Sequence, residues 1–282
     1  MSRYLDPKSD LVFKKIFAGH PNLLKSFLNA VLPLPESGLI ESLEYLPADN
    51  IPEIPEFKHS IVDVRCFDKQ GRHFIVEMQM SWSKHFMQRL LFNAASIYVR
   101  QLKTTEMYKN LNPVYGLAIV ADSFSDEASW FHHYRLMNTE NHQKTIDDIQ
   151  LILLELPHFQ PKTLSEKKLT ALWLRFMTEI DENTRIVDPL LLENPEIKEA
   201  LLLTREAAYT PEELEAYNRN WDAIRTEKTL IDDKLMEGFE KGVKTGVEQM
   251  AKNCLNKGFN EELVAEITGL SLKDVQAIKA TL

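Results

Sequence analysis

Cysteine is scarce in this chain of 282 residues, which contains only Cys66 and Cys254. Cys66 falls in a predicted strand and Cys254 in a predicted helical tail, so we expect no disulfide. Two such distant thiols also exclude a cysteine-based zinc site. The adjacent His132 and His133 would point to opposite sides of a strand, and we expect packing roles for both.

Long apolar runs are also missing. No segment approaches the roughly 18 consecutive apolar residues that a membrane-spanning helix needs. The first residues, MSRYLDPK, have no apolar stretch of the signal-peptide type. We therefore expect no membrane partner and a cytoplasmic location. The content of 44% hydrophobic and 27% charged residues is typical of a globular protein.

Positive charge is in short supply over the whole chain, which has 33 Lys and Arg against 42 Asp and Glu, a net charge of −9. A net negative charge at first argues against nucleic acid. The acidity is nevertheless unevenly distributed. Residues 1–110 carry 14 basic and 12 acidic side chains, whereas residues 111–282 carry 19 and 30. The N-terminal part is therefore near neutral, which permits phosphate contacts without requiring them.

The order of predicted elements indicates an α/β fold, with an α+β mixed sheet and a helical C-terminal region. Residues 9–31 predict one or two short helices, with Ser9 as a cap and a break at residues 19–21. Strands are expected near 42–46 and at 60–67, 73–80, 114–121, 130–137 and 149–156, and helices at 83–104, 165–180, 195–208 and 211–225. These elements predict a core over residues 1–160, a helical extension over 161–230 and a helical tail over 231–282.

The tail differs from the rest of the chain in its glycine spacing. Gly238, Gly242 and Gly246 recur every four residues, so they share one face of a helix and would let another helix approach closely. Residues 260–282 predict a helix-turn-helix, but its second helix offers few cations for a DNA groove. We therefore favour a docking or dimerisation role, and a homo-oligomer formed through the tail, over DNA reading.

A predicted hairpin around Asp68–Arg72 carries the most informative side chains. Gly71 suits the left-handed position of a three-residue loop. The resulting register places Asp63 directly opposite Glu77. Because side chains alternate along strands, Asp63 and Glu77 share one sheet face with Arg65 and Gln79. The other face carries apolar side chains that we expect against the core: Val62, Val64, Cys66, Val76 and Met78.

Two opposed carboxylates need positive charge between them. Their Cβ atoms would be about 4.5–5.5 Å apart, a distance at which like charges destabilise a sheet. Arg65 would relieve the repulsion in a structural arrangement, and Mg²⁺ would do so in a metal site, because it prefers carboxylate oxygens and retains waters. Gln79 would then position an attacking water or a phosphate oxygen. From the residues alone, a polar solvent face of a two-sided sheet is the alternative.

At this hairpin the sequence resembles the PD-(D/E)XK nuclease superfamily. More narrowly, it is similar to the bacterial family of recombination-promoting nucleases and transposases. The similarity covers nearly the whole chain and rests on the order and spacing of several motifs. These are Asp10–Phe17, Ile61–Val64, the E-x-Q element Val76–Gln79, Arg89, Tyr98, Gln101–Leu102, Glu240–Gly242 and Thr268–Ser271.

The resemblance implies a restriction-endonuclease-like core and Mg²⁺-dependent cleavage of DNA, in the setting of recombination or mobile elements. By analogy, Asp63 and Glu77 would be metal ligands, the Met78 carbonyl would be a third, and Asp10 would be an additional acid. We expect DNA as the partner. Lys14, Lys15 and Arg89 are the candidate DNA-binding residues.

One position departs from the superfamily pattern, because Gln79 replaces the usual lysine. A glutamine supplies no positive charge and cannot act as a base. We expect Lys14 or Arg89 to substitute for it from a neighbouring helix. The alternative is a catalytically degenerate nuclease scaffold that acts as a DNA- or protein-binding module.

Overall fold

The computed structural model describes residues 3–46, 64–102, 105–160 and 168–282. The chain divides into two compact units, Met1–Tyr217 and Asn218–Leu282. The first unit contains the sheet and the helices that pack on it, and the second is helical. Within the described residues, no helix is both long enough and apolar enough to cross a bilayer.

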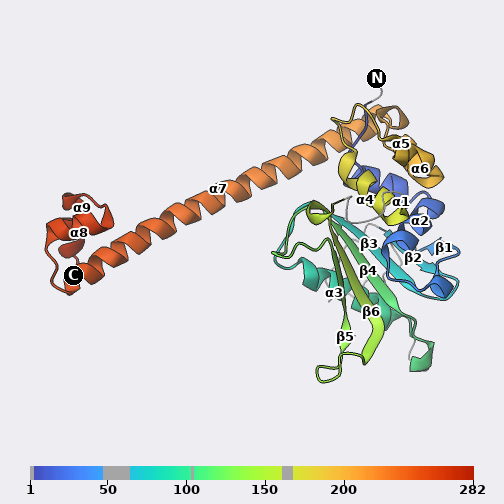
Figure 1. Ribbon diagram of the computed structural model, residues 1–282, viewed down its shortest axis with the longest axis horizontal. Coiled ribbons are helices and arrows are strands. Elements are labelled where there is room, and N and C mark those ends of the chain that lie inside the picture. The colour runs from blue at the N-terminus through green and yellow to red at the C-terminus, as the bar shows by residue number, and fades with distance from the viewer. Residues whose placement is uncertain (1–2, 47–63, 103–104, 161–167) are drawn as a thin grey trace. The chain divides into compact units, whose positions relative to one another are not determined.

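A six-stranded mixed sheet forms the centre of the first unit (Figure 1), with strand order β1-β2-β3-β4-β6-β5. Strands β3, β4 and β6 are parallel, whereas β1, β2 and β3 form an antiparallel run and β5 pairs antiparallel with β6. The bounds are β1 Leu43–Tyr45, β2 Val64–Asp68, β3 His73–Gln79, β4 Val114–Val120, β5 Phe131–Met137 and β6 Thr145–Glu155. The mixed sheet predicted from the sequence is confirmed.

The β2–β3 hairpin has the predicted register over its described residues. Val64 pairs with Val76, and the Asp68 amide donates to the Arg72 carbonyl at 3.1 Å. Gly71 has φ 79°, the left-handed conformation that glycine adopts without steric cost. The buried Asp68 carboxylate accepts two hydrogen bonds from the Arg72 guanidinium, at 2.8 and 2.6 Å. Asp63, the first predicted site residue, lies outside the described residues.

Helix α3 (Phe86–Arg100) covers the sheet face to which Glu77 belongs (Figure 1), packing on β3, β4 and β6. Its close approach needs a small residue on β4, because a Cβ at Gly116 would lie 3.3 Å from Leu90. The face beneath α3 is closed by an apolar cluster that includes Ile75 and Leu90. The alternative expectation of a polar face open to solvent is therefore wrong, since a sheet with parallel central strands is covered on both faces.

The remaining helices of the first unit form an aromatic-rich layer around Trp173, which is fully buried and packs against Phe17 and Phe27 at centroid distances of 5.7 and 5.6 Å. Ser9 caps α1 as predicted, because its side chain accepts from the Val12 amide. The bounds are α1 Asp10–Phe17, α2 Pro21–Val31, α4 Leu169–Glu179, α5 Pro189–Glu193 and α6 Pro195–Leu203. Short 3₁₀ turns span Glu36–Gly38, Tyr108–Asn110, Leu156–His158 and Glu206–Ala208.

The second unit contains most of α7 and a capped helix pair. Helix α7 spans Pro211–Asn256, so the helix predicted over 211–225 continues much further than expected. Helices α8 (Glu261–Thr268) and α9 (Leu272–Lys279) confirm the predicted helix-turn-helix, with Gly269 left-handed at φ 74°. Their small core joins Ala251 of α7 to Val264 and Val275.

Candidate functional site

Glu77 lies near the carboxyl end of β3, in the interior of the sheet. Its side chain is on the face covered by α3 and is only 4% exposed. Its neighbour on β4 is Ala118, which has a small apolar side chain. A carboxylate placed in such surroundings needs hydrogen-bond donors or cations to compensate its lost hydration.

Helix α3 supplies these partners from one face. Asn93 Nδ2 donates to Glu77 Oε1 at 2.8 Å, and Arg89 Nη2 lies 3.8 Å from Glu77 Oε2. Arg89 and Asn93 are four residues apart, so both project from the same side of the helix. Asn93 is 5% exposed. Asn93 therefore lies against the strand, whereas the Arg89 side chain stays partly open to solvent.

The electrostatic balance at Glu77 favours additional positive charge. Burial raises the pKa of the Glu77 carboxyl, and the Asn93 hydrogen bond and the charges of Arg89 and Arg65 offset this only in part. Arg65, on β2, shares the face of Glu77 as predicted. Burial also lowers the pKa of Arg65, and the charge of Arg100 acts in the same direction. The partly buried Arg65 and the exposed Arg89 thus both act on a carboxylate whose ionised form remains under-stabilised.

Gln79 orients Arg89 beside Glu77. The Gln79 Oε1 atom accepts from Arg89 Nη2 at 2.6 Å, and Gln79 Nε2 donates to the Ser81 carbonyl at 2.5 Å. These two bonds fix which end of the amide faces the guanidinium. The guanidinium also lies 4.9 Å from the centre of the Phe86 ring, a cation–π distance. The position of the missing lysine is therefore occupied by an amide that holds an arginine.

The other predicted site residues lie on α1 and β3. Asp10 and Lys14 form an ion pair at 2.7 Å within the first helix. Lys15 donates to the Ala208 carbonyl at 2.6 Å and lies 3.9 Å from the centre of the Tyr209 ring, so it fastens α1 to the segment that precedes α7. Met78 follows Glu77 on β3 and is partly buried. DNA contacts by these lysines stay a prediction.

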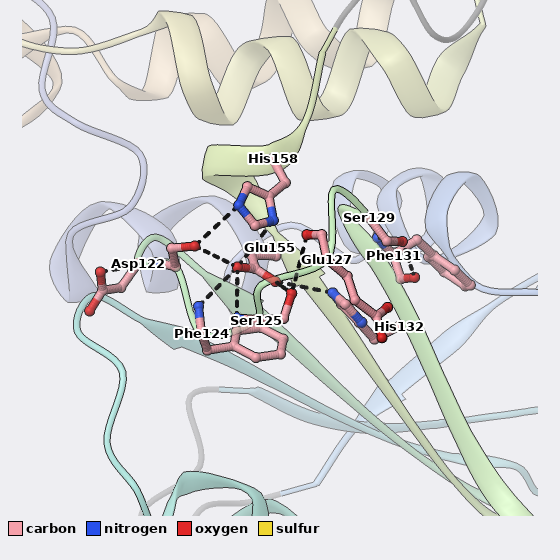
Figure 2. Close-up of polar contacts among 10 residues, drawn as sticks. Asp122, Phe124, Ser125, Glu127, Ser129, Phe131, His132, Glu155 and His158 are labelled. Carbon is pink, nitrogen blue, oxygen red and sulfur yellow. Dashed lines mark hydrogen bonds and ion pairs between the residues drawn. The ribbon is translucent and has the colours of Figure 1, made fainter.

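A second buried glutamate, which the sequence analysis missed, lies at the end of β6. Figure 2 shows polar groups converging on the Glu155 carboxylate from the loop after β4, from β5 and from the turn after β6. The described donors are Phe124 N at 2.9 Å, Ser125 N at 3.3 Å, Ser123 Oγ and Ser125 Oγ at 2.9 Å each, and His132 Nε2 at 3.1 Å. His158 Nδ1 lies 3.3 Å from the same carboxylate.

Hydrogen bonding dominates the electrostatics of Glu155. Burial alone would raise its pKa, but the bonds from the Phe124 amide and from the Ser123 and Ser125 groups outweigh it, and the pKa is lowered. The carboxylate is therefore ionised and saturated with donors. The signal was present in the sequence as one acid at the end of the apolar run LILLE, which requires buried partners. His132, expected only to pack, is one of those partners.

The Glu155 network orders the loop beside the Glu77 cluster. The described segment 122–127, which follows β4, is a loop that contains no helix. Asp122 Oδ2 instead accepts from the Trp82 amide at 2.9 Å, and the Trp82 ring stacks on Phe124 at 4.3 Å. Trp82 follows Gln79 by three residues. The network thus supports the turn that joins β3 to α3.

Of the three predicted metal ligands, the structure describes Glu77 and Met78, whereas Asp63 lies outside the described residues. Among the described residues, no group of three or more His, Cys, Asp or Glu side chains could hold a metal ion. Of the predicted ligands, Glu77 and Met78 belong to β3. The Glu77 carboxylate and the Met78 carbonyl are hard oxygen donors, the kind that Mg²⁺ prefers.

The mixed sheet, with α3 laid on it and an acidic E-x-Q element on β3, has the architecture of a PD-(D/E)XK nuclease fold. Comparison with family models agrees with this class. The chain belongs to the PD-(D/E)XK nuclease family transposases, whose model matches residues 7–234. Membership of this family supports the classification of the chain as a nuclease-type hydrolase with DNA as its substrate. No curated protein and no solved structure is significantly similar to this chain.

Proposed function

We propose that this chain is a Mg²⁺-dependent DNA endonuclease that hydrolyses phosphodiester bonds in recombination or mobile-element biology, in the cytoplasm. The observation that carries the proposal is the buried Glu77 carboxylate on β3, which has Arg89 and Asn93 beside it and a raised pKa. Such a group binds a divalent cation favourably, because the cation supplies the positive charge that its surroundings lack.

Asp63, Glu77 and the Met78 carbonyl would hold the metal ion. A bound Mg²⁺ lowers the pKa of a coordinated water and stabilises charge that develops on a phosphate. Arg89 neutralises phosphate charge in place of the absent lysine, since guanidinium groups pair well with phosphate oxygens. Gln79 holds Arg89 in place through the 2.6 Å bond. Asp10 and Lys14 remain candidates for an additional acid and a phosphate contact.

A plasmid-nicking assay tests this proposal. We expect cleavage by the full chain with Mg²⁺ and none with EDTA. Asp63→Asn and Glu77→Gln should each reduce the rate at least about a hundredfold, because loss of metal-based charge stabilisation costs several kcal/mol. Glu44→Gln, an exposed change on β1, is the matched control and should retain the wild-type rate. Equal residual cleavage by wild type and both site variants would contradict the proposal.

One observation favours the second candidate, a degenerate scaffold that binds DNA or protein. Glu77 is 4% exposed and already has internal partners in Asn93 and Arg89. Under this alternative, Mg²⁺ would not raise the unfolding temperature of the wild type, and a DNA duplex would bind without being cut. Under the endonuclease proposal, Mg²⁺ raises that temperature in the wild type but not in Glu77→Gln.

A further inference from the structure

The second unit carries an apolar stripe on α7, which we define as Ile231, Leu235 and Phe239 followed by Gly242, Gly246 and Met250. The three large side chains are 55%, 69% and 67% exposed. Within the described residues, a Cβ added at Gly242 or Gly246 would meet nothing within 4 Å. The small core with α8 and α9 uses Ala251 and lies beyond the stripe. A run of such side chains left open on a helix marks an association surface.

The side chains of the stripe change from large to small along the helix. Its residues are spaced by three or four, so they lie on one face of the helix. The N-terminal half presents bulky side chains at Ile231, Leu235 and Phe239, whereas the C-terminal half presents Gly242, Gly246 and the flexible Met250. One half therefore offers projections and the other half offers depressions that projections of similar spacing would fill.

The charge of the helix changes at the same place. Residues 222–240 contain six acidic and three basic side chains, and residues 241–257 contain four basic and one acidic side chain. The two halves thus have net charges of −3 and +3. This complementarity is internal to one sequence, so the partner that matches it best is another copy of the same helix running in the opposite direction.

We propose that the stripe pairs with the stripe of a second copy of this chain in an antiparallel helix pair. In the register that we propose, the large side chains of one copy face the glycines and the methionine of the other copy. Phe239 then lies against Gly242, Leu235 against Gly246 and Ile231 against Met250. Each contact occurs twice about a two-fold axis, as in an isologous dimer. A parallel pair would oppose Phe239 to Phe239 and glycine to glycine, and it would place the two acidic halves side by side.

Sedimentation equilibrium of the full chain tests whether the stripe makes the dimer. We expect wild type to reach twice the chain mass of 32.6 kDa, and Leu235→Asp with Phe239→Asp to remain at the single-chain mass. Leu230→Asp is the matched control, because Leu230 is 58% exposed on the opposite face of the same helix. It should dimerise like wild type. Circular dichroism should show unchanged helix content in all three chains, so that loss of the dimer is not loss of the helix.

A monomeric wild type at tens of micromolar would overturn the proposal, as would equal dissociation in the stripe variant and in Leu230→Asp. The relative direction of the two paired helices is tested by cross-linking with a short bis-maleimide in a Cys254→Ser background. Ile231→Cys chains mixed with Met250→Cys chains should cross-link to each other. Ile231→Cys chains alone should not, because the two positions would be about 28 Å apart along the helix pair. The reverse pattern, or a dimer with neither cross-link, would exclude the antiparallel register.

Discussion

At the scale of single residues, the two buried glutamates on one face of the sheet have opposite electrostatic environments. Glu155 receives several hydrogen bonds and has a lowered pKa, whereas Glu77 accepts a hydrogen bond from Asn93 and has a raised pKa. The difference follows from their neighbours, because the loop that follows β4 supplies backbone and hydroxyl donors to Glu155. Opposite pKa shifts give these residues opposite effects on stability.

We expect Glu77→Gln to raise the free energy of unfolding at pH 7 in EDTA by about 1–3 kcal/mol, since it removes an under-compensated buried charge. The unfolded chain loses the Glu77 proton first, so ionisation of Glu77 lowers stability as pH rises above the ordinary value of 4.5. The gain should therefore shrink as pH falls toward 4.5. Urea unfolding between pH 4.5 and 8 measures the difference in unfolding free energy between Glu77→Gln and wild type, with Glu44→Gln as control. A variant less stable than wild type at pH 7 would contradict this.

Glu155→Gln should have the opposite effect. One amide oxygen cannot accept all the bonds made to the carboxylate, so we expect a loss of about 2–4 kcal/mol at pH 7. The pKa of Glu155 is depressed, so its contribution is complete above pH 4.5 and is lost as pH falls through the folded-state pKa. The difference from wild type should therefore decrease in acid. The exposed Glu127→Gln in the same loop is the control, and an equal loss there would refute the assignment to Glu155.

The relation between Gln79 and Arg89 predicts a compensating pair of substitutions. Arg89→Gln should reduce the nicking rate about a hundredfold by removing a charge-stabilising donor. Gln79→Lys should also reduce it, because an ammonium at that position repels the guanidinium now bonded at 2.6 Å. The double variant moves the cation to β3 and should recover to within about tenfold of wild type. Rates under saturating DNA measure this, and additive losses would show that the positions act independently.

At the scale of elements, the β2–β3 hairpin fixes the register on which the site depends. Gly71→Ala places a Cβ 2.9 Å from the Asn112 side chain at φ 79°, so we expect a loss of about 1–3 kcal/mol in unfolding free energy. Gly258→Ala is a matched control, because Gly258 has φ 84° with nothing within 4 Å. Chemical denaturation should give a larger loss for Gly71→Ala. Equal losses would mean that only backbone strain matters.

The sequence correctly predicted those features that are determined by residues close together in the chain. The Ser9 cap and the β2–β3 turn depend on neighbouring residues, and both are confirmed. The partners of Glu155 come from three separate segments, and single-sequence periodicity does not reveal such contacts. The closure of α3 over Glu77 was missed for a similar reason, because Arg89 and Asn93 are polar and resemble a solvent-facing stripe. The length of α7 was underestimated because three glycines disfavour a helix.

At the scale of the whole molecule, the proposed dimer would give each particle two nuclease sites. Two sites held in one particle can cut both strands of a duplex in one encounter, whereas a single site releases a nicked intermediate first. We therefore expect wild type to produce linear plasmid with little nicked intermediate, and Phe239→Asp to accumulate nicked circles before linear product. Leu230→Asp should behave as wild type. Identical time courses for all three chains would mean that cleavage does not depend on pairing.

The apolar stripe has a consequence for how related proteins coexist. The family match ends at residue 234, while most of the stripe lies after it. Chains could then share one catalytic architecture and still differ in the sizes and charges presented by their tails. Mixed assemblies between such chains would juxtapose bulk with bulk or like charge with like charge. Each chain would form homodimers in preference to mixed dimers. Exchanging the tail between two such chains would be enough to change which chain each one pairs with.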